Sequence, residues 1–437
     1  MTPREWLREN THIDHSYLPT IQQLQALGST RPKAAFITLV RNSEFEGMVY
    51  SMTQLEARFN GRNLHGYDWI FFNNEEFTEE FKSFVSNTTS ARCYFETIPE
   101  KHWSIPDWID ESRFDAGRQF IGGIGVGKAW LESYHHMYRW NAGLFALEDR
   151  LKNYDWFWRV EPGVKFTCDI NYDVFRFMQD NDMVYGFNMV ILDDARSFPS
   201  LWERTSKFRK YHRDMLHPES DMTWLLHPRQ DGLVRSPQYE STRDSDDEGE
   251  YNNCQFYSNF EIGSLKYFRG KEHQAYFRHL DQAGGFYYER YGDAPVHTLS
   301  ISMFVPKRRV WYFRNIGYAH SICENCPPHT SSLTRDIERQ RGIPGLRCGC
   351  TTNNFDINHF KLVPFESKQR KPLDTCIRQW LGGRWLQKQP DHEHDMVHIL
   401  AESDDDVYFL DGTEPDPYSV PMPRDKVLRK ALLRIGG

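Results

Sequence analysis

Residues 34–40 read Ala-Ala-Phe-Ile-Thr-Leu-Val, an almost continuous apolar run that stops at the polar residues 41–44. Such a run is typical of a strand that is buried on both faces of a sheet. Residues 44–58 then have a helical pattern, and further strands are predicted at 68–72 and 92–97, each preceded by a helix. This alternation predicts an α/β fold with a parallel-rich sheet covered by helices, in which ligands gather at the carboxyl ends of the strands.

The pattern continues beyond these strands. Residues 127–152 are predicted to form one long helix, and the aromatic stretch 156–160 is predicted to be the next strand. That strand runs directly into Glu161-Pro162-Gly163. Because proline cannot continue a ladder and Pro-Gly favours a tight turn, Glu161 is expected at the exit of the strand. Residues 184–190 are predicted to form a further strand at the sheet edge.

Composition narrows the classes of protein. The chain has 437 residues, 39% of them hydrophobic, and a formal net charge of −8. An acidic chain without a basic block argues against a nucleic-acid binder. No apolar run approaches the roughly 18–20 residues that cross a bilayer, and residues 1–10 lack the apolar centre of a signal peptide. We therefore expect a soluble globular chain. Its many aromatic side chains suit core packing or stacking on sugars and bases.

The eight cysteines are even in number, and four of them lie between residues 323 and 350. They permit two or more disulfides. Cys323 and Cys326, with Cys348 and Cys350, can also be read as a four-thiolate zinc site, although the second pair lacks the usual two-residue spacer. Both readings remain open at this point, and disulfides are favoured.

Motifs with a known chemistry are few. The chain has no Walker-type phosphate loop, no Gly-x-Ser-x-Gly and no His-Glu-x-x-His. Residues 122–128, Gly-Gly-Ile-Gly-Val-Gly-Lys, lack the required spacing and the final Ser or Thr, so we interpret them as a linker. A set of polar residues is instead placed at predicted strand exits: Arg41, Glu161, Asp193, Asp194, Glu261, Asp293, His297 and His320. Carboxylates and imidazoles of this kind can hold a divalent ion, although each residue alone is ordinarily a surface or salt-bridged group.

Residues 154–166, Tyr-Asp-Trp-Phe-Trp-Arg-Val-Glu-Pro-Gly-Val-Lys-Phe, resemble the signature of the fungal GDP-mannose-dependent α-1,2-mannosyltransferases, glycosyltransferase family 15. Further motifs of that family recur in order at 39–44, 175–178, 180–182, 184–187, 258–262 and 283–297. The matching stretches cover roughly residues 30 to 330. Because several long motifs recur at compatible separations, the resemblance is specific.

The resemblance implies a GT-A-like single catalytic domain with a mixed, parallel-rich central sheet flanked by helices. It also implies Mn²⁺, GDP-mannose as donor, and retaining α-1,2 transfer of mannose to a mannoside or a mannosylated glycoprotein in O- or N-glycan extension. Glu161 and His320 match the family's metal ligands. Glu261 matches the glutamate proposed as nucleophile or as stabiliser of the oxocarbenium ion. The alternative places Glu161 in a salt bridge with Arg159 or Lys165, and His320 on the surface.

Three further residues enter through the same resemblance. Tyr134 matches a tyrosine of the site with a catalytic or donor-binding role, and Arg41 and Asp293 are expected to contact the nucleotide or sugar of the donor. The sequence departs from the family pattern at Gln255 and Tyr257, where His and Trp are expected, so acceptor preference can differ.

The resemblance also suggests how the chain is organised and where it acts. We expect a stem-like segment at 1–30, the catalytic domain at 31–360 and a peripheral C-terminal extension at 361–437. Family members are type II membrane proteins of the Golgi lumen, and the anchor is expected to be absent from this chain. An oxidising lumen strengthens the prediction that Cys323, Cys326, Cys348 and Cys350 are in disulfides.

Two alternatives to this function are kept. The same donor site could serve mannosylphosphate transfer, which would add negative charge to the product. The chain could also be a mannan-binding protein that has lost catalysis, although the presence of Glu161, Glu261 and His320 argues against that.

Overall fold

The computed structural model describes residues 31–61, 65–170, 172–226, 249–313, 315–320, 323–326, 348–350, 359–360 and 375–382. The predicted stem at 1–30 and most of the predicted extension at 361–437 lie outside these ranges. No helix among the described residues is both long and apolar enough to span a bilayer.

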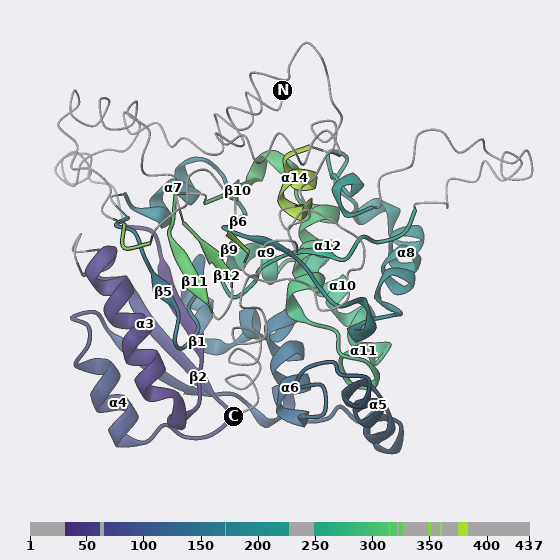
Figure 1. Ribbon diagram of the computed structural model, residues 1–437, viewed down its shortest axis with the longest axis horizontal. Helices are drawn as coiled ribbons and strands as arrows, with labels where there is room; N and C mark the ends of the chain where they lie inside the picture. Colours follow the sequence, from purple (N-terminus) through teal and green to yellow (C-terminus); the bar gives the residue numbers. More distant parts are fainter. Residues whose placement is uncertain are drawn as a thin grey trace, which may run out of the picture.

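The central sheet is built around the predicted strands. Its members are β1 (Ala34–Leu39), β2 (Asp68–Asn73), β3 (Cys93–Thr97), β4 (Trp156–Arg159), β6 (Tyr185–Phe187), β9 (Glu261–Ser264) and β10 (Val310–Tyr312). Within the described part of the chain these strands lie in the order β10-β6-β9-β4-β1-β2-β3 (Figure 1). β4, β1, β2 and β3 are mutually parallel, whereas β9 runs antiparallel between β4 and β6. The prediction of a mixed, parallel-rich sheet is confirmed.

Two smaller sheets accompany the central one. Their strands are β5 (Lys165–Phe166), β7 (Val190–Leu192), β8 (Cys254–Phe256), β11 (Tyr318–His320), β12 (Cys323–Asn325) and β13 (His359–Phe360). β11 pairs antiparallel with β5 on one side and with β12 on the other, and β7 pairs with β8. Because β5 begins shortly after Glu161, its pairing with β11 brings that turn beside the strand that ends at His320.

Helices cover both faces of the central sheet (Figure 1). Their bounds are α3 (Phe45–Arg58), α4 (Glu79–Ser86), α5 (Glu111–Gly123), α6 (Glu132–Arg139), α7 (Val174–Asp180), α8 (Leu201–Tyr211), α9 (Leu265–Phe268), α10 (Lys271–Gln282), α11 (Gly285–Tyr288), α12 (Asp293–Phe304) and α14 (Thr375–Gly382). Alternate residues of β1 point to opposite faces. Phe36 packs in one core with Met52 of α3, whereas Ile37 packs in the other with Leu299 of α12.

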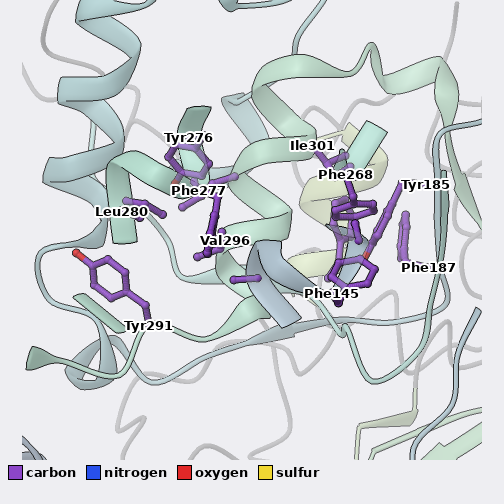
Figure 2. Packing of buried hydrophobic residues seen from close by; sticks show 14 of the residues in the cluster. Phe145, Tyr185, Phe187, Phe268, Tyr276, Phe277, Leu280, Tyr291, Val296 and Ile301 are labelled. Atoms are coloured by element: carbon purple, nitrogen blue, oxygen red, sulfur yellow. The ribbon is translucent and has the colours of Figure 1, made fainter. Parts of the chain in front are cut away.

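Aromatic rings fill these cores. Figure 2 shows Phe145, Tyr185, Phe187 and Phe268 close together in the core that also contains Val296 and Ile301 of α12. The Phe268 ring centre lies 5.3 Å from that of Phe145 and 6.4 Å from that of Tyr185. This packing holds the Tyr185 ring in place, and its hydroxyl group belongs to the site described below.

The predicted long helix at 127–152 is wrong. α6 occupies only Glu132–Arg139 and continues into a π turn, Trp140–Leu144. Glu148 has an extended backbone, and its buried carboxylate accepts hydrogen bonds from Trp140 Nε1 (2.9 Å) and from the ring of His102 (2.8 Å). These tertiary contacts to a buried charge end the helix.

The prediction of one edge strand at 184–190 is also wrong. β6 ends at Phe187 and β7 begins at Val190, in a different sheet. β6 lies inside the central sheet, because β10 pairs with it in parallel and forms the edge. The backbone N–H of Phe313 donates to the carbonyl of Phe187, and that of Tyr257 donates to Met189, so separate partners divide the segment.

The cysteine prediction is confirmed for three of its four members and wrong for Cys323. The disulfides are Cys168–Cys348, Cys254–Cys376 and Cys326–Cys350, and Cys323 is a buried free thiol. Cys323 lies in β12 opposite His320, and burial raises the pKa of its thiol while the neighbouring Tyr257 side chain opposes that shift. The residue is therefore turned away from the other sulfurs, whereas Cys326 lies beyond the end of the strand and reaches Cys350.

Helix α14 lies beyond residue 360, where a peripheral extension is predicted. Its Ile377 and Trp380 are nevertheless buried in the core that contains α12, and Cys376 is bonded to Cys254 next to β8. The Trp380 ring packs edge-on against Phe187 and Phe256. This helix is therefore an internal part of the fold.

Candidate active site

A buried arginine organises the site. Arg159 is the last residue of β4 and lies opposite Glu261 of β9 in the antiparallel register. Its guanidinium faces three carboxylates: Nε is 2.6 Å from Glu161, and Nη1 is 2.5 Å from Asp293 and 3.7 Å from Glu261. These charges outweigh the effect of burial and hold the Arg159 pKa well above its ordinary value. Three of the predicted site residues therefore meet at one cation.

Glu261 is the most enclosed of the three carboxylates, with only 1% of its surface exposed. It accepts hydrogen bonds from Tyr185 Oη (3.1 Å) and from Nδ1 of His297 (2.9 Å). Burial alone would lower the pKa of His297, but the carboxylate of Glu261 and then the charge of Asp293 raise it above its ordinary value. The raised pKa favours a protonated His297 ring beside Glu261.

Asp293 begins α12, and its carboxylate also accepts a hydrogen bond from Ser258 Oγ (2.8 Å). Burial acts to raise its pKa, but the charges of Arg159 and His297 and the hydrogen bonds lower it. Three carboxylates therefore share the single guanidinium of Arg159. The cluster can therefore stabilise positive charge that develops next to it.

Glu161 leaves β4 and enters the turn formed with Pro162 and Gly163, where Gly163 has a φ of +77° that glycine adopts without strain. Ser51 of α3 donates to the backbone carbonyl of Glu161 (2.9 Å), which ties the turn to that helix. The side chain is 19% exposed, and Oε1 accepts from Arg159. Among the described residues, Oε2 of Glu161 has no hydrogen-bond donor. The salt bridge to Arg159 that formed part of the alternative is present, and it leaves one oxygen available.

His320 ends β11 and is half-buried. Its Nδ1 lies 3.3 Å from the hydroxyl of Tyr257. Burial lowers the pKa of His320, and the charge of Glu161 partly opposes that shift, which places the carboxylate within electrostatic reach of the ring. The alternative of a surface His320 therefore does not hold. With Nδ1 held by Tyr257, Nε2 of a neutral ring is the nitrogen left to bind a ligand.

Tyr134 is connected to the site through Lys128, a residue that was not predicted to take part in the chemistry. In α6, its hydroxyl group hydrogen-bonds to Lys128 Nζ at 2.6 Å. The charge of Lys128 in turn acts on His320, where it contributes to the lowered pKa. Lys128 lies in the segment interpreted as a linker and has a φ of +60°, a conformation that is uncommon outside glycine.

Arg41 lies at the same sheet edge but apart from the cluster. It follows β1, its side chain is exposed, and its backbone N–H donates to Glu44 (2.9 Å). Within the described ranges, no hydrogen bond or ion pair joins Arg41 to the Arg159 cluster. Asp194, another candidate, is paired with Arg196 (2.7 Å) instead.

Sequence reasoning missed Arg159, Tyr185 and Ser258 as members of the site. Arg159 carried a usable signal, because it is a charged residue at the end of an otherwise aromatic strand, and a buried charge requires partners. Tyr185 and Ser258 had no such signal. Their roles follow only from the pairing of β6 with β9 and from the position of α12.

The sequence and fold of this chain can be compared with those of known proteins. The family described as Glycolipid 2-alpha-mannosyltransferase matches residues 7–359. Glycolipid 2-alpha-mannosyltransferase 2 of Candida albicans is 41% identical over 296 residues, which are 68% of this chain and 60% of that protein. The chain thus spans less than two thirds of that relative. Alpha-1,2 mannosyltransferase KTR1 of Saccharomyces cerevisiae is 38% identical over 332 residues, or 75% of this chain and 79% of that protein.

Solved structures agree with these sequence relatives. The mannosyltransferase Ktr4p of S. cerevisiae in complex with GDP superposes with a TM-score of 0.69 and 32% identity, covering 87% of this chain and 91% of that one. Core-mannan synthase A of Aspergillus fumigatus, in a Mn/GDP form, has a TM-score of 0.64 and 40% identity, covering 74% and 80%. The shared architecture is the GT-A-like fold.

Proposed function

Because this chain belongs to the glycolipid 2-alpha-mannosyltransferase family, we propose that it transfers mannose from GDP-mannose to a mannoside or mannosylated glycoprotein, forming an α-1,2 linkage with retention of anomeric configuration. The observation that carries the proposal is the cluster of Glu161, Glu261 and Asp293 around Arg159 at the carboxyl end of β4. Family members act in glycan extension, and we propose the Golgi lumen as the place of action.

The role of Glu261 follows from its surroundings. Cleavage of the donor's glycosidic bond builds positive charge on the anomeric carbon, and an anionic carboxylate stabilises that charge or forms a short-lived covalent bond. Tyr185 and His297 both hold Oε2 of Glu261, which leaves Oε1 less engaged, 3.7 Å from Arg159. The ring of His297 fixes the position of the Glu261 carboxylate through the hydrogen bond from Nδ1.

Two sets of residues offer ligand atoms that Mn²⁺ accepts. Ligand atoms of Glu261, Asp293 and His297 lie within 4.8 Å of one another, but the guanidinium of Arg159 already provides the cation there. Among the described residues, one carboxylate oxygen of Glu161 and one ring nitrogen of His320 have no hydrogen-bond partner, and such oxygen and nitrogen ligands suit Mn²⁺. We therefore propose Glu161 and His320 as its protein ligands. Bound with GDP, the ion would offset the negative charge that builds on the leaving diphosphate.

The remaining residues bind and orient the substrates in this proposal. The charge of Lys128 acts on the pKa of His320, and Lys128 and its hydrogen-bond partner Tyr134 can contact the diphosphate. Arg41, exposed at the same edge, is available to the nucleotide, and Asp293 to the donor sugar. Gln255 is buried in β8 and Tyr257 follows that strand, so both are candidates for setting acceptor preference.

The direct test is a product analysis. The protein is incubated with GDP-mannose, Mn²⁺ and a panel of mannosides, and the linkage of the product is determined by NMR. We expect an α-1,2-linked mannose on a neutral product. A product with added negative charge would assign mannosylphosphate transfer instead, and binding of mannan without turnover would assign the non-catalytic alternative.

A further inference from the structure

A concave site lies at the end of the central sheet opposite the candidate active site. A cavity of about 610 Å³ is lined by residues that precede or begin the parallel strands, among them Lys33, Asp68, Arg92 and Tyr154. The candidate active site lies where the same strands end. Since β1 has six residues and a strand rises about 3.3 Å per residue, the two sites are separated by roughly the length of that strand.

The charge of this cavity contrasts with that of the whole chain. Its lining carries four cationic side chains, Arg31, Lys33, Arg92 and Arg150, against the single carboxylate of Asp68. The chain as a whole has a net charge of −8. The cavity lining is therefore positively charged although the chain as a whole is negatively charged. Clustered positive charge of this kind attracts anions.

Intramolecular pairing does not neutralise the cavity. Arg150 is paired with Glu96, 2.5 Å away, and Asp68 can balance one further cation. The Arg31 guanidinium donates to the backbone carbonyl of Gly66 (2.6 Å), which carries no charge. In the described part of the chain, Arg31 and Lys33 have no carboxylate partner, so the equivalent of two positive charges remains unpaired.

Aromatic rings hold the arginine side chains in place. The Arg31 guanidinium lies over the Tyr67 ring, 4.1 Å from its centre, and the Arg150 guanidinium lies 4.3 Å from the centre of the Tyr94 ring. Guanidinium groups that are ordered before binding lose less entropy when they bind an anion.

We propose that this cavity binds the phosphate group of a small soluble molecule, either a sugar phosphate or a nucleotide, independently of the donor site. Guanidinium groups match the geometry of phosphate oxygens, and Lys33 adds a mobile point charge. The volume is in the range of pockets that hold small ligands. Excess positive charge disfavours a metal ion there, and an uncharged glycan would leave the cations unpaired.

The test measures binding by calorimetry to the full chain in EDTA, so that no metal supports nucleotide binding at the candidate active site. The probes are inorganic phosphate, mannose 6-phosphate and GMP, with mannose as the uncharged control. We expect saturable binding of phosphorylated probes that weakens as NaCl is raised, because salt screens these charges. Tighter binding of mannose 6-phosphate or of GMP than of phosphate identifies which class of molecule the site takes.

Arg31→Gln combined with Lys33→Gln should weaken that binding tenfold or more. The matched control, Lys82→Gln with Lys207→Gln, removes the same charge from exposed ion pairs on α4 and α8 and should bind like the wild type. Circular dichroism and mannosyl transfer report on folding in both variants. Equal affinity of the two double variants, or no saturable binding of any phosphorylated probe, would overturn the proposal. Neither result depends on the proposed transferase activity.

Discussion

At the scale of single residues, the site depends on how one arginine is shared. Arg159 is hydrogen-bonded to Glu161 and Asp293 and lies near Glu261, and His297 hydrogen-bonds to Glu261. A buried cation left without partners would be costly, so each carboxylate also stabilises the fold. The role of a carboxylate in turnover must therefore be separated from its role in stability, which requires that folding be measured beside activity.

Glu261→Gln preserves shape and removes charge. We expect turnover of GDP-mannose to fall by a hundredfold or more, on the order of 3 kcal/mol of transition-state stabilisation, whereas GDP binding stays intact. Steady-state transfer and GDP calorimetry measure the two effects. The control, Glu203→Gln, alters an exposed glutamate of α8 that is paired with Lys207. Near-normal turnover of Glu261→Gln would remove it from the reaction.

Glu161→Ala and His320→Ala test the proposed metal ligands. Since two protein ligands form a weak site without the diphosphate, we expect each variant to lose Mn²⁺-dependent GDP binding while thermal unfolding still shows a folded protein. Calorimetric titration of GDP with and without Mn²⁺ gives the comparison. A variant that keeps its Mn²⁺-dependent binding excludes the substituted side chain as a ligand.

At the scale of elements, close packing of Gly143 against Phe277 determines the shape of the segment after α6. A Cβ atom on Gly143 would lie 2.3 Å from Cγ of Phe277 in α10, whereas one on Gly123 would have no atom within 4 Å. Gly143→Ala should therefore destabilise the protein by about 1–3 kcal/mol through overpacking. Gly123→Ala should be neutral or stabilising by up to about 1 kcal/mol, because alanine favours helix. Thermal unfolding distinguishes them, and equal midpoints would contradict the predicted close packing.

His273 of α10 is buried against Ser300 of α12, and its titration should make the stability of the fold depend on pH. Burial, and then the charge of His297, lower the pKa of His273 to about 3. Below pH 6.5, His273 binds a proton in the unfolded chain but stays neutral in the folded one. The free energy of unfolding therefore falls as pH falls from 6.5 towards 3. The expected slope is about 1.4 kcal/mol per pH unit. His273→Gln should reduce this dependence of the unfolding free energy on pH, measured by urea unfolding at a series of pH values. His212→Gln is the control. An unchanged slope in His273→Gln would contradict the attribution to His273.

At the scale of the whole molecule, disulfides join distant parts of the chain. Cys254–Cys376 closes 122 residues and fastens α14 to β8, and Cys168–Cys348 closes 180 residues. We expect two thiols per chain, Cys93 and Cys323, to react under denaturing conditions without reductant, and eight after reduction. Four reactive thiols before reduction would contradict this pairing.

Cys254→Ser with Cys376→Ser should destabilise the protein by about 2–5 kcal/mol, because the unfolded chain regains the freedom of a long loop. The midpoint of thermal unfolding measures the loss. Cys93→Ser, which removes a free thiol, is the matched control and should change stability little.

The sequence alone determined the local features of this protein. The apolar runs at 34–40 and 68–72 formed the predicted parallel strands, since continuous apolar runs suit strands buried on both faces. The turn after β4 placed Glu161 at a strand exit, because Pro162 and Gly163 end the ladder. The motif resemblance also identified the family, and it named Glu261 and Asp293, which the structure brings to Arg159.

Only the tertiary structure decided which distant residues meet. Pairing of β5 with β11 brought His320 beside the turn of Glu161, and the register of β4 with β9 set Glu261 opposite Arg159. The long helix at 127–152 was broken by the buried Glu148 and the contact between Gly143 and Phe277, and Cys323 was turned towards Tyr257. The local sequence does not predict which residue a hundred positions away will be in contact, because register and packing depend on the whole core.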